Sequence, residues 1–126
     1  MAGTLTISTL KDSSGVLATQ NGMTGICKAW VDFDGTTSPG TIRDSFNVGS
    51  VTKNATGDYT INFTTSMANA NYAGQVCIGA VGTSDGVGGG YSNATRIAAS
   101  FRIRTLNSTQ SASKDFDSIY VVVNGS

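Results

Sequence analysis

Two Asp-Phe-Asp triplets carry the residues best suited to chemistry, at Asp32-Phe33-Asp34 and Asp115-Phe116-Asp117. Residues two apart on a strand share a face, so each triplet offers paired carboxylates for glycosidic acid/base work or for calcium. A calcium loop starting at the first triplet would have its glycine at position 4 and an arginine at position 12, where an EF-hand needs glycine at 6 and glutamate at 12. We therefore expect turn capping, with cation binding as the alternative.

The residue inventory argues against catalysis as well. The chain has no His and no Glu, which excludes Ser-His-Asp and Cys-His nucleophiles and His-ligated zinc. Nothing beside the carboxylates is placed to set two of their pKa values apart. The sequence predicts a non-enzymatic protein with no catalytic residue, no cofactor and no metal site.

Basic and aromatic residues are candidates for contact with another molecule. Arg96, Arg102 and Arg104 are separated by even numbers of residues on the predicted strand 96–105, which would place them on one face. Guanidinium groups bind carboxylates or anionic sugars. Trp30 shares a face with Lys28 on the predicted strand 26–33, and this face would point to solvent in a single sandwich. An indole there would expose a large apolar surface unless another group packs on it. Trp30 therefore belongs to the inter-sheet core, packs on a second chain or stacks on sugar. We name Trp30 and the three arginines as candidate subunit contacts, with plain solvation as the alternative for the arginines.

A glycine-rich stretch at 82–93 is the longest irregular segment. A phosphate cradle would need a following Lys and a helix, and neither is present. We predict an exposed loop suited to recognition. Its candidate ligand contacts are Asp85, Gly86, Gly88, Gly89, Gly90 and Tyr91.

The elements that must hold these residues are strands, because apolar and polar residues alternate with period two between clusters of turn formers. The predicted strands span 4–9, 26–33, 42–48, 58–64, 72–81, 96–105 and 118–123. No segment longer than about ten residues has helical apolar spacing. The sequence predicts an all-β fold, an antiparallel β-sandwich or small jelly-roll-like barrel of about seven strands.

Three runs carry specific expectations about faces. In 42–48 we expect Ile42, Phe46 and Val48 to share one face. The run 72–81 is apolar on both faces, which suits a central strand or one packed on another chain. In 96–105 the inward residues are expected to be Ile97, Ala99, Phe101 and Ile103.

The length and the net charge of the chain limit the number of domains and the kinds of partner it can have. The 126 residues amount to one domain, and eight basic residues balance eight acidic ones, which excludes a basic nucleic-acid footprint. No stretch approaches the ~20 apolar residues of a membrane span, so no membrane partner is expected.

Residues 1–25 are predicted to be an extended arm or linker that orders on contact with a partner, and residues 26–126 the β domain. Cys27 and Cys77 are expected to be buried, reduced thiols, with a disulfide as the alternative.

Several segments together resemble a known module. They are Lys28-Ala29-Trp30-Val31-Asp32-Phe33-Asp34-Gly35-Thr36, then 42–48, then 56–65 with Met67 and Ala70-Asn71-Tyr72, and later Phe101-Arg102-Ile103-Arg104-Thr105. Over about residues 25–123 the chain resembles the C-terminal β-rich region of tailed-bacteriophage tail-fibre and virion-surface proteins. The family often has Asn where Asp32 and Asp34 stand, and Pro where Ala68 stands.

The resemblance implies a non-enzymatic, homotrimeric module on the virion surface, made in the bacterial host cytoplasm, with other tail or capsid proteins as partners. Two roles stay open. One is a tail-fibre tip that binds host surface glycans through the loop at 82–93. The other is a capsid decoration protein, of the cement or head-fibre kind, anchored to the shell by its N-terminal arm. A fragment of a polysaccharide-degrading spike is the third and least supported role.

Overall fold

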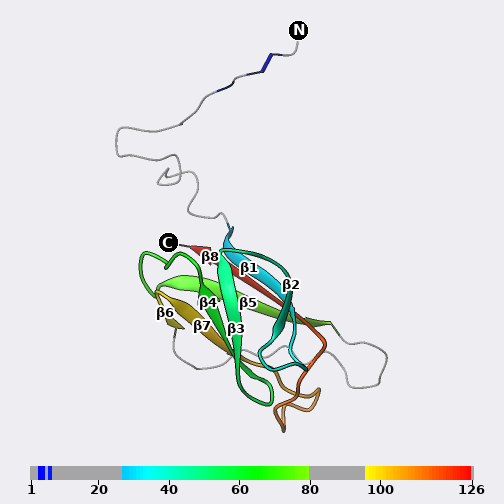
Figure 1. Ribbon diagram of the computed structural model, residues 1–126. Helices are drawn as coiled ribbons and strands as arrows, with labels where there is room; N and C mark the ends of the chain where they lie inside the picture. Colours follow the sequence, from blue (N-terminus) through cyan, green and yellow to red (C-terminus); the bar gives the residue numbers. More distant parts are fainter. Residues whose placement is uncertain (1–2, 5, 7–26, 80–95, 126) are drawn as a thin grey trace.

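The computed structural model describes residues 3–4, 6, 27–79 and 96–125, and in these ranges the chain is all-β (Figure 1). The strands are β1 (Cys27–Asp34), β2 (Thr41–Phe46), β3 (Val48–Ala55), β4 (Asp58–Phe63), β5 (Tyr72–Gly79), β6 (Arg96–Ile97), β7 (Ser100–Arg104) and β8 (Ser118–Gly125). Within the described ranges no helix is long and apolar enough to span a membrane.

The strands form two antiparallel four-stranded sheets, in the orders β2-β1-β8-β5 and β3-β4-β7-β6. Alternation explains how each strand is oriented, since successive side chains point to opposite faces. In β1 the residues Ala29, Val31 and Phe33 are buried, while Trp30 between them is only half-buried. The predicted all-β class and antiparallel pairing are confirmed.

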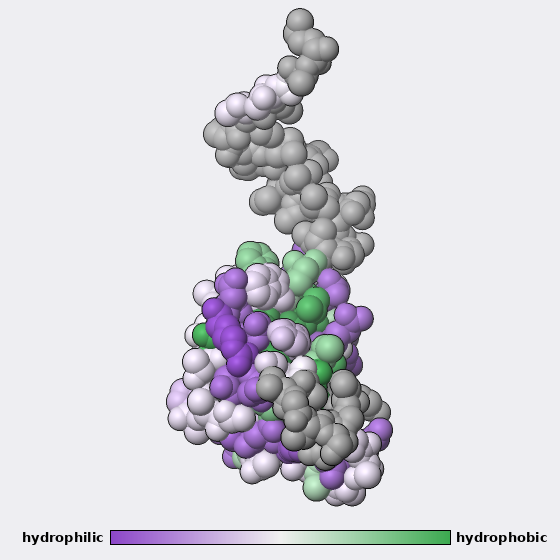
Figure 2. Space-filling view, turned by 90° about the vertical axis from the view of Figure 1, so that its right-hand side faces the viewer, coloured by the Kyte–Doolittle hydropathy of each residue, from purple (hydrophilic) through white to green (hydrophobic). Residues whose placement is uncertain are grey.

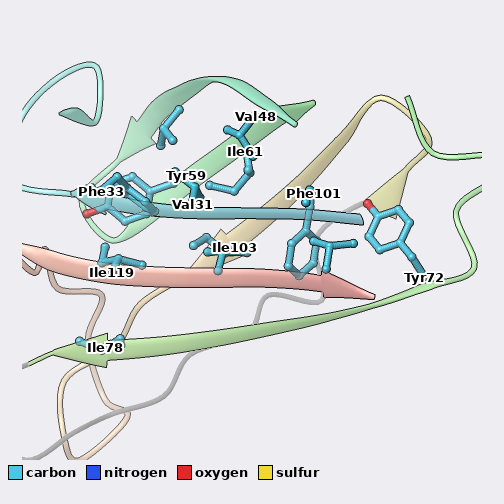
Figure 3. Close-up of a cluster of buried hydrophobic side chains, with 14 of the residues drawn as sticks. Val31, Phe33, Val48, Tyr59, Ile61, Tyr72, Ile78, Phe101, Ile103 and Ile119 are labelled. Atoms are coloured by element: carbon cyan, nitrogen blue, oxygen red, sulfur yellow. The ribbon is translucent and has the colours of Figure 1, made fainter. Parts of the chain in front are cut away.

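The inner faces of the two sheets enclose one hydrophobic core (Figure 3). Phe33 and Tyr59 meet edge-on at one end, with ring centroids 5.2 Å apart, and Tyr72 and Phe101 do so at the other end, 5.9 Å apart. This edge-to-face geometry is the one that aromatic quadrupoles favour. The Tyr72 hydroxyl also donates to the carbonyl of Ser100 at 2.8 Å, which ties β5 in one sheet to β7 in the other.

The predicted strand at 42–48 is divided in the structure. Asn47 adopts a φ of 56°, and the chain crosses there from β2 in one sheet to β3 in the other. Phe46 lies opposite Trp30 on the outer face of its sheet and is 53% exposed, because the bulge at Arg43 reverses the alternation after Ile42, while Val48 is buried. The expectation that these two residues share a face was wrong, because a left-handed residue between two strands interrupts their alternation.

The predicted strand at 96–105 is also divided. The chain turns at Ala98 and Ala99 to form the β6–β7 hairpin, in which Arg96 lies opposite Phe101. Phe101 and Ile103 are buried as expected, but Ile97 is 46% exposed and Ala99 is exposed. No Gly, Pro, Asn or Asp marks this turn, so its residues read as a continuation of the strand.

Two further strands differ from expectation. The strand β3 was not predicted beyond its first residue, because Gly49 and Asn54 interrupt its pattern as bulges. The run that forms β5 is an edge strand of its sheet, and a central position was therefore wrong for it. Of the predicted strand at 4–9, the structure describes only Thr4 and Thr6, which are exposed and outside any strand.

Candidate functional site

The outer face of the β2-β1-β8-β5 sheet carries a line of three apolar side chains and one amide, which we call the outer row: Phe46, Trp30, Val122 and Gln75. Strand registers place Phe46 opposite Trp30, Trp30 opposite Val122, and Val122 opposite Gln75. Directly opposed residues on antiparallel strands project from the same face. Trp30 and Val122 are half-buried beside the exposed Phe46. The space-filling view shows apolar side chains gathered in the upper part of the molecule, with hydrophilic ones around them (Figure 2).

The structure decides one of the three interpretations of Trp30. Its neighbours Ala29 and Val31 are 0% and 1% exposed and form the inter-sheet core, so Trp30 points to the opposite side of β1. The core interpretation was therefore wrong. A second chain and a stacked sugar remain as the two candidates for what covers the indole.

A polar row runs beside the outer row and consists of Asp44, Asp32, Tyr120 and Cys77. Arg43 Nη1 donates to the Asp32 carboxylate at 3.0 Å. Arg43 is the extra residue of the bulge where β2 slips against β1, which frees its side chain to reach across the sheet. Its other nitrogen lies 3.9 Å from Asp34 Oδ2 and donates to the carbonyl oxygen of Asp117.

The first Asp-Phe-Asp triplet caps a turn, as predicted. Asp34 Oδ1 accepts hydrogen bonds from the Thr36 hydroxyl at 2.6 Å and from the Thr36 backbone N–H at 2.8 Å. The hydrogen bond from the Thr36 hydroxyl has the largest effect on the pKa of Asp34, followed by the one from the Thr36 backbone, and both hold it below its usual value. The positive charge of Arg43 lowers this pKa further. Both carboxylates of this triplet thus have partners within the chain.

The second triplet anchors three loops through Asp115. Its carboxylate accepts from the Tyr59 hydroxyl at 2.6 Å, from Lys53 Nζ at 2.7 Å and from the backbone N–H of Gly57 at 2.7 Å. Lys53 Nζ also donates to the carbonyl of Gly35 at 2.9 Å, and the same carbonyl lies 2.9 Å from the Tyr59 hydroxyl as a second acceptor within its reach. The expectation of local turn capping was wrong for Asp115, because its carboxylate instead ties the segments around residues 35, 57 and 115 together.

This Asp115 cluster shifts two pKa values in opposite directions. Desolvation by burial raises the pKa of Asp115, but hydrogen bonds from Lys53, Tyr59 and Gly57 outweigh it, so the net pKa lies below the usual value. Burial, and then the hydrogen bond to the Asp115 carboxylate, raise the pKa of Tyr59. Tyr59 is therefore neutral and donating, and Asp115 is ionised and accepting, throughout the neutral range.

The three candidate arginines do not share one face. Arg102 forms two hydrogen bonds with the Asp58 carboxylate, at 2.6 and 2.8 Å, and their effect is to lower the pKa of Asp58. Arg104 donates to the Ser113 hydroxyl at 2.8 Å. Arg96 lies on the other side of the hairpin turn and donates to the carbonyl of Tyr72 at 2.8 Å. Each arginine thus has a partner within its own chain, and their role as subunit contacts stays a prediction.

The other expectations have mixed outcomes. The candidate ligand-contact loop, Asp85, Gly86, Gly88, Gly89, Gly90 and Tyr91, lies outside the described residues. Cys27 and Cys77 are both free thiols, but Cys77 is exposed and Cys27 half-buried, so the expectation of burial was wrong. In the described part of the chain, no group of three or more Cys, Asp, Glu or His could hold a metal.

No family model, curated protein or solved structure compared with the chain matches it.

Sequence reasoning found Trp30 but missed the neighbours that form the outer row with it. Phe46 was assigned to the wrong face because the bulge at Arg43 reverses the alternation between Ile42 and Phe46. Val122 carries a signal that was available, since it is apolar at an outward position of β8, between the buried Val121 and Val123. A strand with apolar residues on both faces indicates a second buried surface.

Proposed function

We propose that this chain is a non-enzymatic structural module on the exterior of a tailed-bacteriophage particle, a homotrimer of β-sandwich domains at the tip of a tail fibre. The single observation that supports it best is the outer row, an apolar line across a sheet whose other face already forms the core. The resemblance of 28–36, 42–48 and 56–65 to phage tail-fibre and virion-surface modules supplies the setting.

The outer row favours a subunit seam over a sugar platform. Sugar sites combine an aromatic ring with polar groups that are available to the ligand's hydroxyls. Beside Trp30, the Asp32 carboxylate is already bonded to Arg43. Three side chains in line, on strands about 4.8 Å apart, instead present a flat strip that a second protein surface can cover. Full burial of one such side chain is worth about 1.5–3 kcal/mol.

The seam is tested by the mass of the assembly in solution. Light scattering at micromolar concentration is expected to give a multiple of three copies for the natural chain. The substitution Trp30→Ala is expected to lower the mass towards a third of the natural value, because it removes the largest side chain of the outer row. The matched control is Ile97→Ala, which removes another exposed apolar side chain, 46% exposed, from the opposite sheet. A natural chain that runs as a monomer would refute the seam, and so would a Trp30→Ala mass equal to that of the control.

The position of the chain on the virion is tested with purified phage particles. Gold-labelled antibody against the chain is expected to mark fibre tips in electron micrographs. Replacing residues 85–90 with a short Gly-Ser linker should abolish adsorption to host cells and leave the thermal midpoint nearly unchanged. Label on the capsid, adsorption that survives the loop replacement, and loss of capsid binding after deletion of residues 1–21 would instead establish the decoration role.

A further inference from the structure

The two sheets have four edge strands, β2, β5, β3 and β6. An edge strand presents unpaired N–H and C=O groups, and proteins protect such edges with charge, bulges, inward-pointing charged residues or short length. In this chain three of the four edges carry such a device. The exception is β5.

The three protected edges differ in how they are protected. Strand β2 carries Arg43 and Asp44 and is bulged against β1. Strand β3 has two register shifts against β4, and its Lys53 side chain turns inward to the Asp115 cluster. Strand β6 is only two residues long. None of these edges offers another strand a long, regular and uncharged ladder.

Strand β5 offers such a ladder. All eight of its residues pair with β8 in one unbroken register, and none of the eight is charged or proline. On its outer face Ala73, Gln75 and Cys77 are exposed. Among the described residues, the only hydrogen bond that reaches the β5 backbone from outside its sheet is the one from Arg96 to the carbonyl of Tyr72. No other described residue pairs with this edge.

We propose that β5 pairs antiparallel with β5 of a second copy of this chain, so that two sheets join into one of eight strands. An uncharged strand suits self-pairing, because the residue on the two-fold axis faces its own copy and every other residue faces another residue of the same strand, so no pair brings like charges together. Opposed residues share a face, so outward residues must oppose outward residues. A register centred on Gln75 meets this condition and overlaps seven residues of each strand.

This register also makes the outer rows continuous. Gln75 ends the outer row in one copy and would face Gln75 of the second copy. The two rows then form one line, from Phe46 through Trp30 and Val122 in each copy. The contact lies at the side of the sheet and leaves its broad outer face free. In a closed assembly, whose two-fold axis crosses the axis of the seam at a right angle, this pairing doubles the number of copies.

The test uses charge at the centre of the proposed pair. Gln75→Lys and Gln75→Glu each place like charges together across the two-fold axis and should each halve the mass measured by native mass spectrometry at low ionic strength. Mixing the two variants should restore the full mass, with one Lys copy paired to each Glu copy. Gln75→Thr, which is neutral and has high strand propensity, is the matched control and should keep the natural mass.

Two outcomes would overturn the proposal. They are a natural chain with an odd number of copies, and charged variants that fold with an unchanged thermal midpoint yet keep the natural mass. The seam and the virion location do not depend on the factor of two, so their failure would be seen separately.

A second measurement needs no variant. Alternate β5 amides point to β8 and to the free edge, so pairing should protect both sets from hydrogen exchange, and dilution should expose only the second set. Rapid exchange of that set at every protein concentration would also overturn the pairing.

Discussion

The Asp115 cluster gives the sharpest stability prediction, for the substitution Asp115→Ala. It removes the acceptor of three hydrogen bonds, from Lys53, Tyr59 and Gly57, and each bond to a charged group is worth about 1.5–3 kcal/mol. The sum overstates the loss, because Lys53 keeps its hydrogen bond to the Gly35 carbonyl and the Tyr59 hydroxyl can turn its single proton to the same carbonyl. Only the Gly57 N–H loses its sole partner.

The ion pair sets the expected size of the effect. Removing one partner of a fully buried pair costs about 3–5 kcal/mol. Here the Lys53 and Asp115 side chains are 14% and 25% exposed, so water compensates in part. We expect Asp115→Ala to lower the free energy of unfolding by about 3 kcal/mol, and the melting temperature by about 10 °C for a domain of this size.

The assay is urea unfolding followed by circular dichroism, with Asp44→Ala as the control. Asp44 is exposed and accepts a hydrogen bond only from the adjacent Ser45 N–H, so its loss should cost less than about 0.5 kcal/mol. Equal losses for the two substitutions would refute the view that Asp115 ties the three loops together.

The pH dependence of this difference follows from the lowered pKa of Asp115. A carboxyl whose pKa is lower in the folded state stabilises the fold above its unfolded value, 3.8, and loses that contribution as pH falls through the folded value. The stability gap between the natural chain and Asp115→Ala should therefore be constant between about pH 5 and 7 and shrink below pH 3.8. A gap of constant size through the acid range would show that the charge of Asp115 is not what stabilises the cluster.

Three further substitutions test local geometry by the same unfolding assay. Gly74→Ala would place a Cβ 2.4 Å from the Phe101 ring, so we expect a loss of about 1–3 kcal/mol from overpacking, and a neutral result would mean that the ring moves aside without cost. Gly57→Ala combines a φ of 62° with a Cβ 2.4 Å from the Thr105 carbonyl oxygen, and a loss of at least about 1 kcal/mol is expected. Asn47→Ala removes side-chain hydrogen bonds to Lys28 and Thr65 at the crossing between sheets, and should cost about 1–2 kcal/mol; an unchanged midpoint would show that backbone pairing alone directs the crossing.

The sequence determined the class of fold and the orientation of its most regular strands. Alternation with period two predicted strands where β1, β4, β7 and β8 lie, and in β7 it predicted the inward residues Phe101 and Ile103, which are both in the core. Burial of an alternating strand depends only on its own residues and on the presence of some partner surface. Sequence reasoning also predicted turn capping by the first Asp triplet, where Asp34 forms its hydrogen bonds with the nearby Thr36.

Only the tertiary structure decided which strands end at a sheet edge and which residues meet on a face. Asn47, with positive φ, moved Phe46 and Val48 to different sheets, and a turn at two alanines separated Arg96 from Arg102. The partners of Asp115 come from residues 53, 57 and 59, more than fifty positions away in the chain. Such contacts depend on strand order and register, which arise from the packing of all eight described strands together and are not encoded in any single run of residues.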